Sequence, residues 1–165
     1  SNVDKYVPPD LMTNVPGVSR TASTGNITFA SALGTTLTNL DDWSISIDAN
    51  EFVSISIVLY LSLTTDGDFK YAFTGPSGLQ MHSQGILVGR DSGTVVDAAF
   101  ESAPDGTGVP IIANADGEFV LRIDAGFMSD GTAGTIQFQY AQNTSDDNDE
   151  HLRRQSTFVA SRSWH

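Results

Sequence analysis

The segment from Glu51 to Leu63 alternates between apolar and polar residues over most of its length. Six aliphatic residues recur at every second position: Val53, Ile55, Ile57, Leu59, Leu61 and Leu63. Serine residues and Tyr60 occupy most of the positions between them. Because successive side chains of a β-strand point to opposite faces, this spacing predicts a long strand with one buried face. A helix would spread the same residues around its circumference, so a sheet must form around this segment.

Shorter apolar and β-branched runs lie on both sides of this strand, separated by clusters of Gly, Pro, Asp and Asn. The further strands that this pattern predicts cover residues 26–30, 36–40, 43–47, 69–73, 79–88, 94–100, 109–113 and 117–124. No segment has a convincing helical period. Many short strands with turn signals between them predict an all-β, antiparallel β-sandwich. The number of strands favours a jelly roll over an immunoglobulin fold, whose Cys…Trp…Cys spacing is absent.

Two connections carry the signals of β-hairpins. Residues 133–145 read A-G-T-I-Q-F-Q-Y-A-Q-N-T-S and alternate, and residues 152–162 alternate in a similar way near the C-terminus. We expect these two segments to pair as a closing hairpin. Asp66-Gly67 lies between the alternating runs 51–63 and 69–73, and Asp-Gly in this position predicts a tight hairpin turn.

The composition restricts the classes of site and partner. The 165 residues are enough for one domain with a core, and the absence of Cys excludes disulfides and thiolate metal sites. With 20 acidic and 8 basic residues the formal net charge is −12, which makes nucleic acid a poor partner. No apolar run reaches the roughly 18 residues of a membrane span, so no membrane partner is expected. The first residues are polar and include Asp4 and Lys5, unlike a secretory signal.

The N-terminal residues differ from the rest of the chain. Apolar side chains without a clear period are interrupted by prolines, which exclude a regular helix or central strand. We predict an extended arm over residues 1–25 and one sandwich domain over 26–165. A solvated tail is the alternative, but the number of large apolar side chains favours docking against the domain or a neighbouring subunit. The candidate partner-binding residues are Tyr6, Val7, Pro8, Pro9, Leu11, Met12, Val15 and Pro16.

Three acidic motifs suggest chemistry, and each has a simpler structural interpretation. Asp91-Ser92-Gly93-Thr94 matches the D-[ST]-G-T string of aspartic proteases, but Gly89-Arg90 stands where an apolar strand should precede it, so we predict a turn. Residues 66–68 and 146–150 are acidic clusters without the ligand order of an EF-hand. We interpret them as a turn and a solvated loop, and predict no metal site.

The histidines and exposed aromatics give no catalytic pattern. His82, His151 and His165 are scattered, and no G-x-S-x-G elbow supports a Ser-His-Asp triad. We therefore predict no catalytic residue, no cofactor and no enzymatic activity. The aromatic residues that can stack on sugar rings are Tyr60, Tyr71, Trp43 and Trp164, for which core or subunit contacts are the favoured interpretation.

Several of these segments resemble one family. The strand AGTIQFQYAQNTS, the closing STFVASR over residues 156–162, and D-F-K-Y-A-F-T-G-P-S-G over residues 68–78 are similar to blocks in β-sandwich virion proteins of tailed bacteriophages. Members of that family are capsid decoration (cement) proteins and tail-fibre modules. The resemblance covers about residues 40–164 and consists of packing and turn residues, so no active-site residue is implied.

The resemblance implies a structural function in a virion. A sandwich with a single arm favours a decoration protein that stabilises the head shell by bridging neighbouring major capsid subunits as a homotrimer. Such a protein would be made in the host cytoplasm and would lie on the capsid surface. The alternatives are a receptor- or glycan-binding module of a tail fibre or spike, and a cellular carbohydrate-binding or adhesion module.

Overall fold

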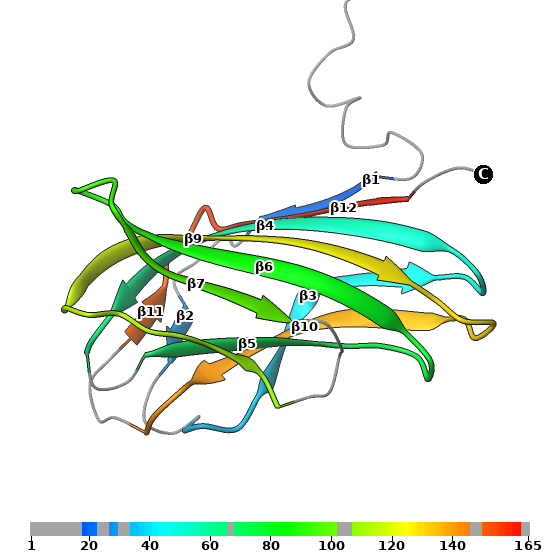
Figure 1. Cartoon of the computed structure of the whole chain (residues 1–165), viewed down its shortest axis with the longest axis horizontal. Helices are drawn as coiled ribbons and strands as arrows, with labels where there is room; N and C mark the ends of the chain where they lie inside the picture. The colour runs from blue at the N-terminus through cyan, green and yellow to red at the C-terminus, as the bar shows by residue number, and fades with distance from the viewer. Residues whose placement is uncertain are drawn as a thin grey trace, which may run out of the picture.

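The structure is a computed structural model that describes residues 18–22, 27–29, 34–65, 68–101, 107–145 and 150–162. Within these ranges the chain forms twelve β-strands and no helix, arranged as two antiparallel sheets packed face to face (Figure 1). The prediction of an all-β sandwich is confirmed. The arm residues predicted to bind a partner, between Tyr6 and Pro16, lie outside the described residues.

The larger sheet has the strand order β1-β12-β4-β9-β6-β7, with β11 and β2 beside the end of β4. Its strands are β1 (Val18–Ala22), β2 (Ile27–Phe29), β4 (Phe52–Leu63), β6 (Gln80–Gly89), β7 (Val95–Glu101), β9 (Gly117–Met128), β11 (Glu150–Leu152) and β12 (Thr157–Arg162). Both β11 and β12 pair with β4, one after the other along its length. In turn β2 pairs with β11 and β1 with β12, so β1 and β2 form one interrupted edge of the sheet.

The smaller sheet has the order β3-β10-β5-β8. Its strands are β3 (Thr38–Ile47), β5 (Phe69–Thr74), β8 (Val109–Ile111) and β10 (Gly134–Gln142). The chain crosses between the sheets at most connections, and the β6–β7 hairpin extends the larger sheet beyond β9. Without this hairpin each sheet has four strand positions, connected as in a jelly roll. The jelly-roll topology follows from this order.

Aromatic rings from both sheets meet in the core. Trp43 of β3 lies 5.7 Å from Phe138 of β10 and 5.8 Å from Phe158 of β12, measured between ring centroids. Phe73 of β5 and Phe127 of β9 meet edge to face at 5.0 Å, again across the sheets. The six aliphatic side chains that alternate along β4 are all buried, as their spacing predicts. Burial of this continuous apolar layer is the main stabilising term of a sandwich.

The predicted closing hairpin is wrong. Although β10 and β12 alternate as expected, β10 pairs with β3 and β5, whereas β12 pairs with β1 and β4 of the other sheet. Their apolar faces point toward each other, and Phe138 and Phe158 contact Trp43 from opposite sheets. Alternation fixes which face of a strand is buried but does not distinguish a neighbour in the same sheet from a strand across the core.

The predicted Asp66-Gly67 hairpin is also wrong, because β4 and β5 lie in different sheets. Asp68, at the end of this connection, makes two hydrogen bonds. Its backbone N–H donates to the Thr64 carbonyl at 3.4 Å, and its carboxylate accepts from the Ala113 N–H at 2.8 Å. These bonds turn the chain toward the smaller sheet. The predicted segments 36–40 and 43–47 belong to one strand, β3. Residues 79–88 and 94–100 match β6 and β7 within one residue at each end.

Candidate interaction surface

The described chain enters the sandwich at an edge of the larger sheet. Strand β1 pairs with β12 over five residue pairs, from Val18 opposite Ser161 to Ala22 opposite Thr157. Residues 18–22 fall within the segment predicted as an arm, and they are an edge strand of the sandwich. The residues before Val18 therefore connect to the domain beside the C-terminal end of β12.

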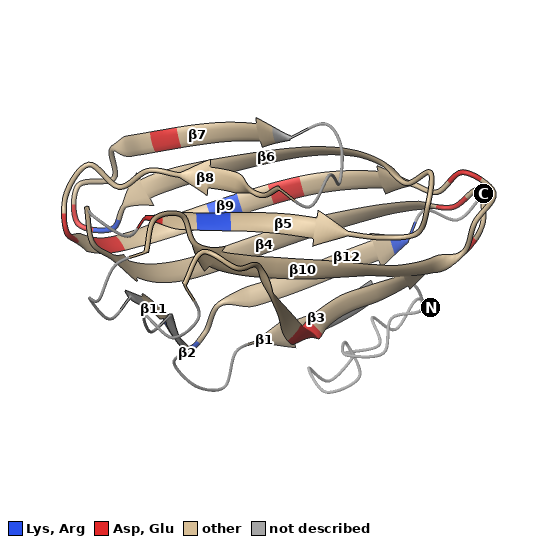
Figure 2. Ribbon diagram, turned by 90° about the horizontal axis from the view of Figure 1, so that it is seen from below, with Lys and Arg blue, Asp and Glu red and all other residues tan. Residues whose placement is uncertain are grey.

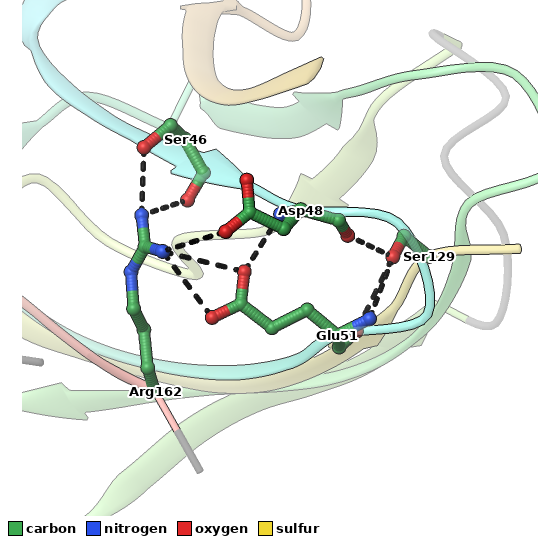
Figure 3. A network of polar contacts seen from close by, with 5 residues as sticks. All are labelled: Ser46, Asp48, Glu51, Ser129 and Arg162. Atoms are coloured by element: carbon green, nitrogen blue, oxygen red, sulfur yellow. Dashed lines mark hydrogen bonds and ion pairs between the residues drawn. The ribbon is translucent and has the colours of Figure 1, made fainter. Parts of the chain in front are cut away.

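The next residue of β12, Arg162, joins the two sheets at this place (Figure 3). Its Nη2 donates to the carbonyl and to the hydroxyl of Ser46 on β3, each at 2.7 Å. Its Nη1 lies 3.3 Å from Glu51 Oε1 and 3.6 Å from Asp48 Oδ2. The Arg162 and Glu51 side chains are only 26% and 15% exposed, so this ion pair is less screened than a surface pair.

Ser129 fixes the β3–β4 turn from the other side. It is 3% exposed, its hydroxyl donates to the Asp48 carbonyl, and it accepts from the Glu51 N–H at 3.0 Å. The Glu51 carboxylate in turn accepts from the Asp48 N–H at 2.7 Å. We call Ser46, Asp48, Glu51, Ser129 and Arg162 the Arg162 clasp. The clasp fastens β3, β4, β9 and β12 where the N-terminal residues join the domain.

A shallow groove crosses the outer face of the larger sheet. It has a volume of about 370 Å³ and lies over β12, β4 and β9. The residues that line it with outward side chains or glycine are Ser54, Ser56, Asp124, Gly126, Val159 and Ser161. These residues are mostly small, and Asp124 is the largest polar side chain among them.

Asp124 is the charged group of this groove. Its carboxylate accepts from the Ser56 hydroxyl and from Arg122 Nε, both at 2.8 Å. Partial burial raises the pKa of Asp124, but the hydrogen bonds from Arg122 and Ser56 and the charge of Arg122 outweigh it and hold the pKa below its ordinary value. The carboxylate is therefore ionised at neutral pH, and with 53% of the side chain exposed it retains free acceptor positions.

The opposite edge of the larger sheet presents apolar side chains. On β7, Phe100 is 73% exposed and Val95 is 59% exposed, and both lie on the outer face. The outward positions of β6 and β7 carry no Asp, Glu, Lys or Arg: Gln80, His82, Gln84, Ile86, Val88, Val95, Ala98 and Phe100. Figure 2 shows that many acidic residues lie instead in the loops at the two ends of the sandwich. We call these eight residues the β7 face.

Asp97 protects the free edge of β7. Its carboxylate accepts from the Ala98 N–H and from the Ile112 N–H, both at 2.8 Å, so it links β7 to the end of β8 in the other sheet. An inward acidic group at an edge strand opposes the addition of another strand. A partner at this edge would therefore contact side chains of the β7 face rather than extend the sheet.

Where the structure describes them, the motifs with apparent chemistry lie apart in the fold. Asp91-Ser92-Gly93-Thr94 forms the β6–β7 turn, as predicted, with the Gly93 N–H donating to the Gly89 carbonyl at 2.8 Å and Gly93 at a φ of 64°. His82 is exposed on the outer face of β6, whereas the neighbouring Ser83 is buried on the inner face. Residues 146–149 and His165 lie outside the described residues. Among the described residues no three His, Asp or Glu side chains gather as a metal site.

The predicted core role is confirmed for two of the aromatic residues. Trp43 and Tyr71 belong to the core, while Tyr60 is exposed on the outer face of β4. Trp164 lies outside the described residues. No helix in the described part of the chain is long and apolar enough to span a membrane.

The Arg162 clasp and the groove were not predicted from the sequence. The outward serines of β4 were visible as polar positions, but the residues that complete the groove come from β9 and β12, at positions fixed only by strand register. Arg162 and Ser46 are 116 residues apart, and no local pattern connects them.

No protein-family model matches the chain, and no curated protein matches it. Among solved structures the chain is similar to VP2 in a subviral particle of infectious bursal disease virus, with 14% identity and a TM-score of 0.24. A structure of the Gx strain of that virus gives 16% identity and a TM-score of 0.23. The similarity covers 90% and 91% of this chain, which spans 40% of each of those chains. At these TM-scores neither the fold nor a function is transferred.

Proposed function

We propose that this chain is a virion structural protein that decorates the capsid of a tailed bacteriophage. In this proposal the sandwich lies on the capsid surface, and residues of the N-terminal arm bind across neighbouring major capsid subunits. The strand sequences that resemble decoration proteins support it, and they belong to both sheets, in β10 and β5 of the smaller sheet and β12 of the larger. The role is structural and involves no cofactor or catalytic step.

The observation that carries the proposal is the position of Val18, where the predicted arm meets the described sandwich, beside the Arg162 clasp. The arm joins the domain at Val18, beside Ser161, and the adjacent Arg162 ties the larger sheet to Ser46 of the smaller one. The strand that carries β1 is therefore fixed to the larger sheet by its pairing with β4 and to the smaller sheet through Arg162. A decoration protein that resists expansion of a pressurised shell needs such a rigid point of attachment.

The arm would bind through its apolar residues. Burial of these side chains against a capsid subunit would stabilise the complex; they are Tyr6, Val7, Leu11, Met12 and Val15. Pro8, Pro9 and Pro16 restrict the arm to extended conformations and so reduce the entropy lost on binding. Each bound copy stabilises the shell by linkage, and joining several arms in one oligomer multiplies the effect.

The β7 face is the proposed contact between copies in a homotrimer. The chain has a net charge of −12, so copies approach with least repulsion on a surface without acidic residues. The β7 face meets this condition and carries the exposed Phe100 and Val95. It lies at the opposite edge of the larger sheet from β1, which leaves the arm free to reach a capsid subunit.

A truncation tests the role of the arm. A chain lacking residues 1–16 retains β1, and it is expected to fold and melt like the full chain but to lose binding to expanded, undecorated capsids in a co-sedimentation assay. A second variant keeps the full length and replaces Tyr6, Leu11 and Met12 by Ser. It removes apolar side chains of the arm without shortening the chain, and it should lose capsid binding too. Capsid binding as tight as that of the full chain by both variants would refute the proposed role of the arm.

A receptor- or glycan-binding module of a tail fibre or spike is the second candidate function. The groove over β12, β4 and β9 favours it, because this groove presents hydrogen-bonding groups on a rigid surface.

A further inference from the structure

We propose that the groove on the outer face of the larger sheet binds a neutral carbohydrate chain. This inference rests on the second candidate function and deepens it. Its central residues belong neither to the arm nor to the β7 face, and only its extension onto β6 reaches His82 and Gln84 of that face. It assigns a ligand class to Ser54, Ser56, Ser161, Asp124 and Phe52.

The groove recognises ligands through side chains alone. It lies over β4, which is paired on both sides with β12 and β9, and over β9, which is paired on both sides with β4 and β6. The backbone groups of these central strands are used in the sheet, so an extended peptide cannot add as a further strand. A ligand here must match hydroxyl and carboxylate groups that are fixed in position.

Those groups are suited to sugar hydroxyls. The hydroxyls of Ser54 and Ser161 lie 2.7 Å apart and share one hydrogen bond, which leaves further donor and acceptor capacity toward solvent. Next to them Asp124 is oriented by Ser56 and Arg122. A carboxylate held in this way can accept from two adjacent hydroxyls of a sugar ring without a change of rotamer. Pre-orientation reduces the entropy cost of binding.

An aromatic ring flanks the end of the groove. Gly126 lies opposite Ser54, and a Cβ atom placed on Gly126 would be 3.4 Å from Cε2 and Cζ of Phe52. The Phe52 ring therefore borders the surface of Gly126, in van der Waals range of the space that a side chain would fill. The ring offers an apolar surface for the C–H face of a sugar beside the polar floor of serines.

Charge and size limit the ligand further. Arg122 is paired with Asp124, and the chain has a net charge of −12, so an acidic polysaccharide is disfavoured. Beyond β9, Gln84 lies opposite Asp124 and His82 lies opposite Gly126, which extends the polar rows onto β6. Four neighbouring strands span about 14 Å at about 4.8 Å per strand. The surface suits a short neutral oligosaccharide lying across the strands.

The test uses the full-length protein and a panel of neutral oligosaccharides of glucose, galactose, mannose, rhamnose and N-acetylglucosamine. Binding is followed by amide chemical shifts in two-dimensional NMR spectra. At least one oligosaccharide is expected to shift the amides of residues 54–56, 124–126 and 159–161 saturably. Asp124→Asn should weaken this binding about tenfold, as expected for loss of a charged hydrogen-bond acceptor. The matched control is Asp42→Asn, which changes an exposed residue of β3 in the other sheet. This variant should bind like the unmodified protein.

Three results would overturn the inference. One is that no oligosaccharide of the panel shifts the groove amides, and another is that the shifts map to a different surface. The third is that Asp124→Asn, folded by the same spectra, binds as tightly as Asp42→Asn. Because capsid co-sedimentation is measured separately, failure here leaves the decoration proposal standing, and failure there leaves the glycan site standing.

Discussion

Arg162 of β12 donates two hydrogen bonds of 2.7 Å to Ser46 of β3, one to its carbonyl and one to its hydroxyl. The two residues belong to different sheets, so this contact closes one end of the sandwich with a charged side chain rather than with apolar packing. The same guanidinium group reaches the carboxylate of Glu51 in the β3–β4 turn. It is placed beside the point where the N-terminal residues enter the domain.

Arg162→Ala is expected to destabilise the domain. The substitution removes the Arg162 donors from the Ser46 carbonyl and hydroxyl and from the largely buried Glu51 carboxylate, which keeps only the Asp48 N–H among the donors in the described part of the chain. Hydrogen bonds to charged groups contribute about 1.5–3 kcal/mol, so the free energy of unfolding should fall by about 2 kcal/mol in urea titrations. Arg90→Ala is the control, because the Arg90 side chain is 55% exposed where it pairs with Asp91 and Glu118, and it should change stability by less than about 1 kcal/mol. Equal effects of the two substitutions would contradict a clasp.

Gly85→Ala should also destabilise the domain, through steric overlap. A Cβ atom at Gly85 would lie 2.9 Å from the hydroxyl oxygen and 3.2 Å from Cε1 of Tyr71, whose side chain is fully buried. Overpacking of this kind costs about 1–3 kcal/mol. Gly126→Ala is the matched control, because its Cβ would meet Phe52 at the ordinary contact distance of 3.4 Å. Thermal unfolding should show a lower midpoint for Gly85→Ala alone, and a normal midpoint would mean that the core adapts.

The contribution of Asp124 to stability should depend on pH. Its pKa in the folded protein lies below the ordinary value of 3.8. The stabilisation that it contributes is therefore fully present above the ordinary value and is lost as the pH falls through the lower folded value. The difference in unfolding free energy between the unmodified protein and Asp124→Asn should stay constant from about pH 7 to about pH 5 and shrink below about pH 4. A difference that grows on acidification would contradict the assigned direction.

Val95→Ser combined with Phe100→Ser should prevent formation of the proposed homotrimer. The two residues are the most exposed large apolar side chains among those described on the β7 face. Native mass spectrometry should show trimers for the unmodified protein and monomers for the double variant, with little change in the melting of the fold. Met128→Ser, which replaces an exposed residue outside this face, should leave the trimer intact. A double variant that remains trimeric would place the contact elsewhere.

The sequence was sufficient to predict most of the strands and their buried faces, but it missed β1, which lies in the predicted arm, and the short β11, and it did not give the pairing between strands. The alternation along β4 identified all six of its buried aliphatic residues, since period two and burial are both local properties. The partners of β10 and β12 could not be predicted, because the same alternation serves a strand in the same sheet and one across the core. Asp66-Gly67 has the local chemistry of a hairpin, yet long-range bonds from Asp68 and the packing of β5 with β10 direct the chain into the other sheet.

Neither the groove nor the Arg162 clasp could be predicted from a local sequence pattern. The groove depends on the register of β4 against β9 and β12, which brings Asp124 opposite Ser56 and Ser161 opposite Ser54. A shift of one residue in either pairing would turn these side chains to the opposite face. The Arg162 clasp joins segments from distant parts of the chain, so its components were each unremarkable in the sequence.

The most direct test of the proposed function is co-sedimentation of the purified full-length protein with expanded, undecorated capsids, together with its native mass in solution. The proposal predicts a trimer that binds capsids saturably, and it predicts that bound capsids resist heating better than bare ones. A monomer that does not bind capsids at any concentration would contradict the decoration function.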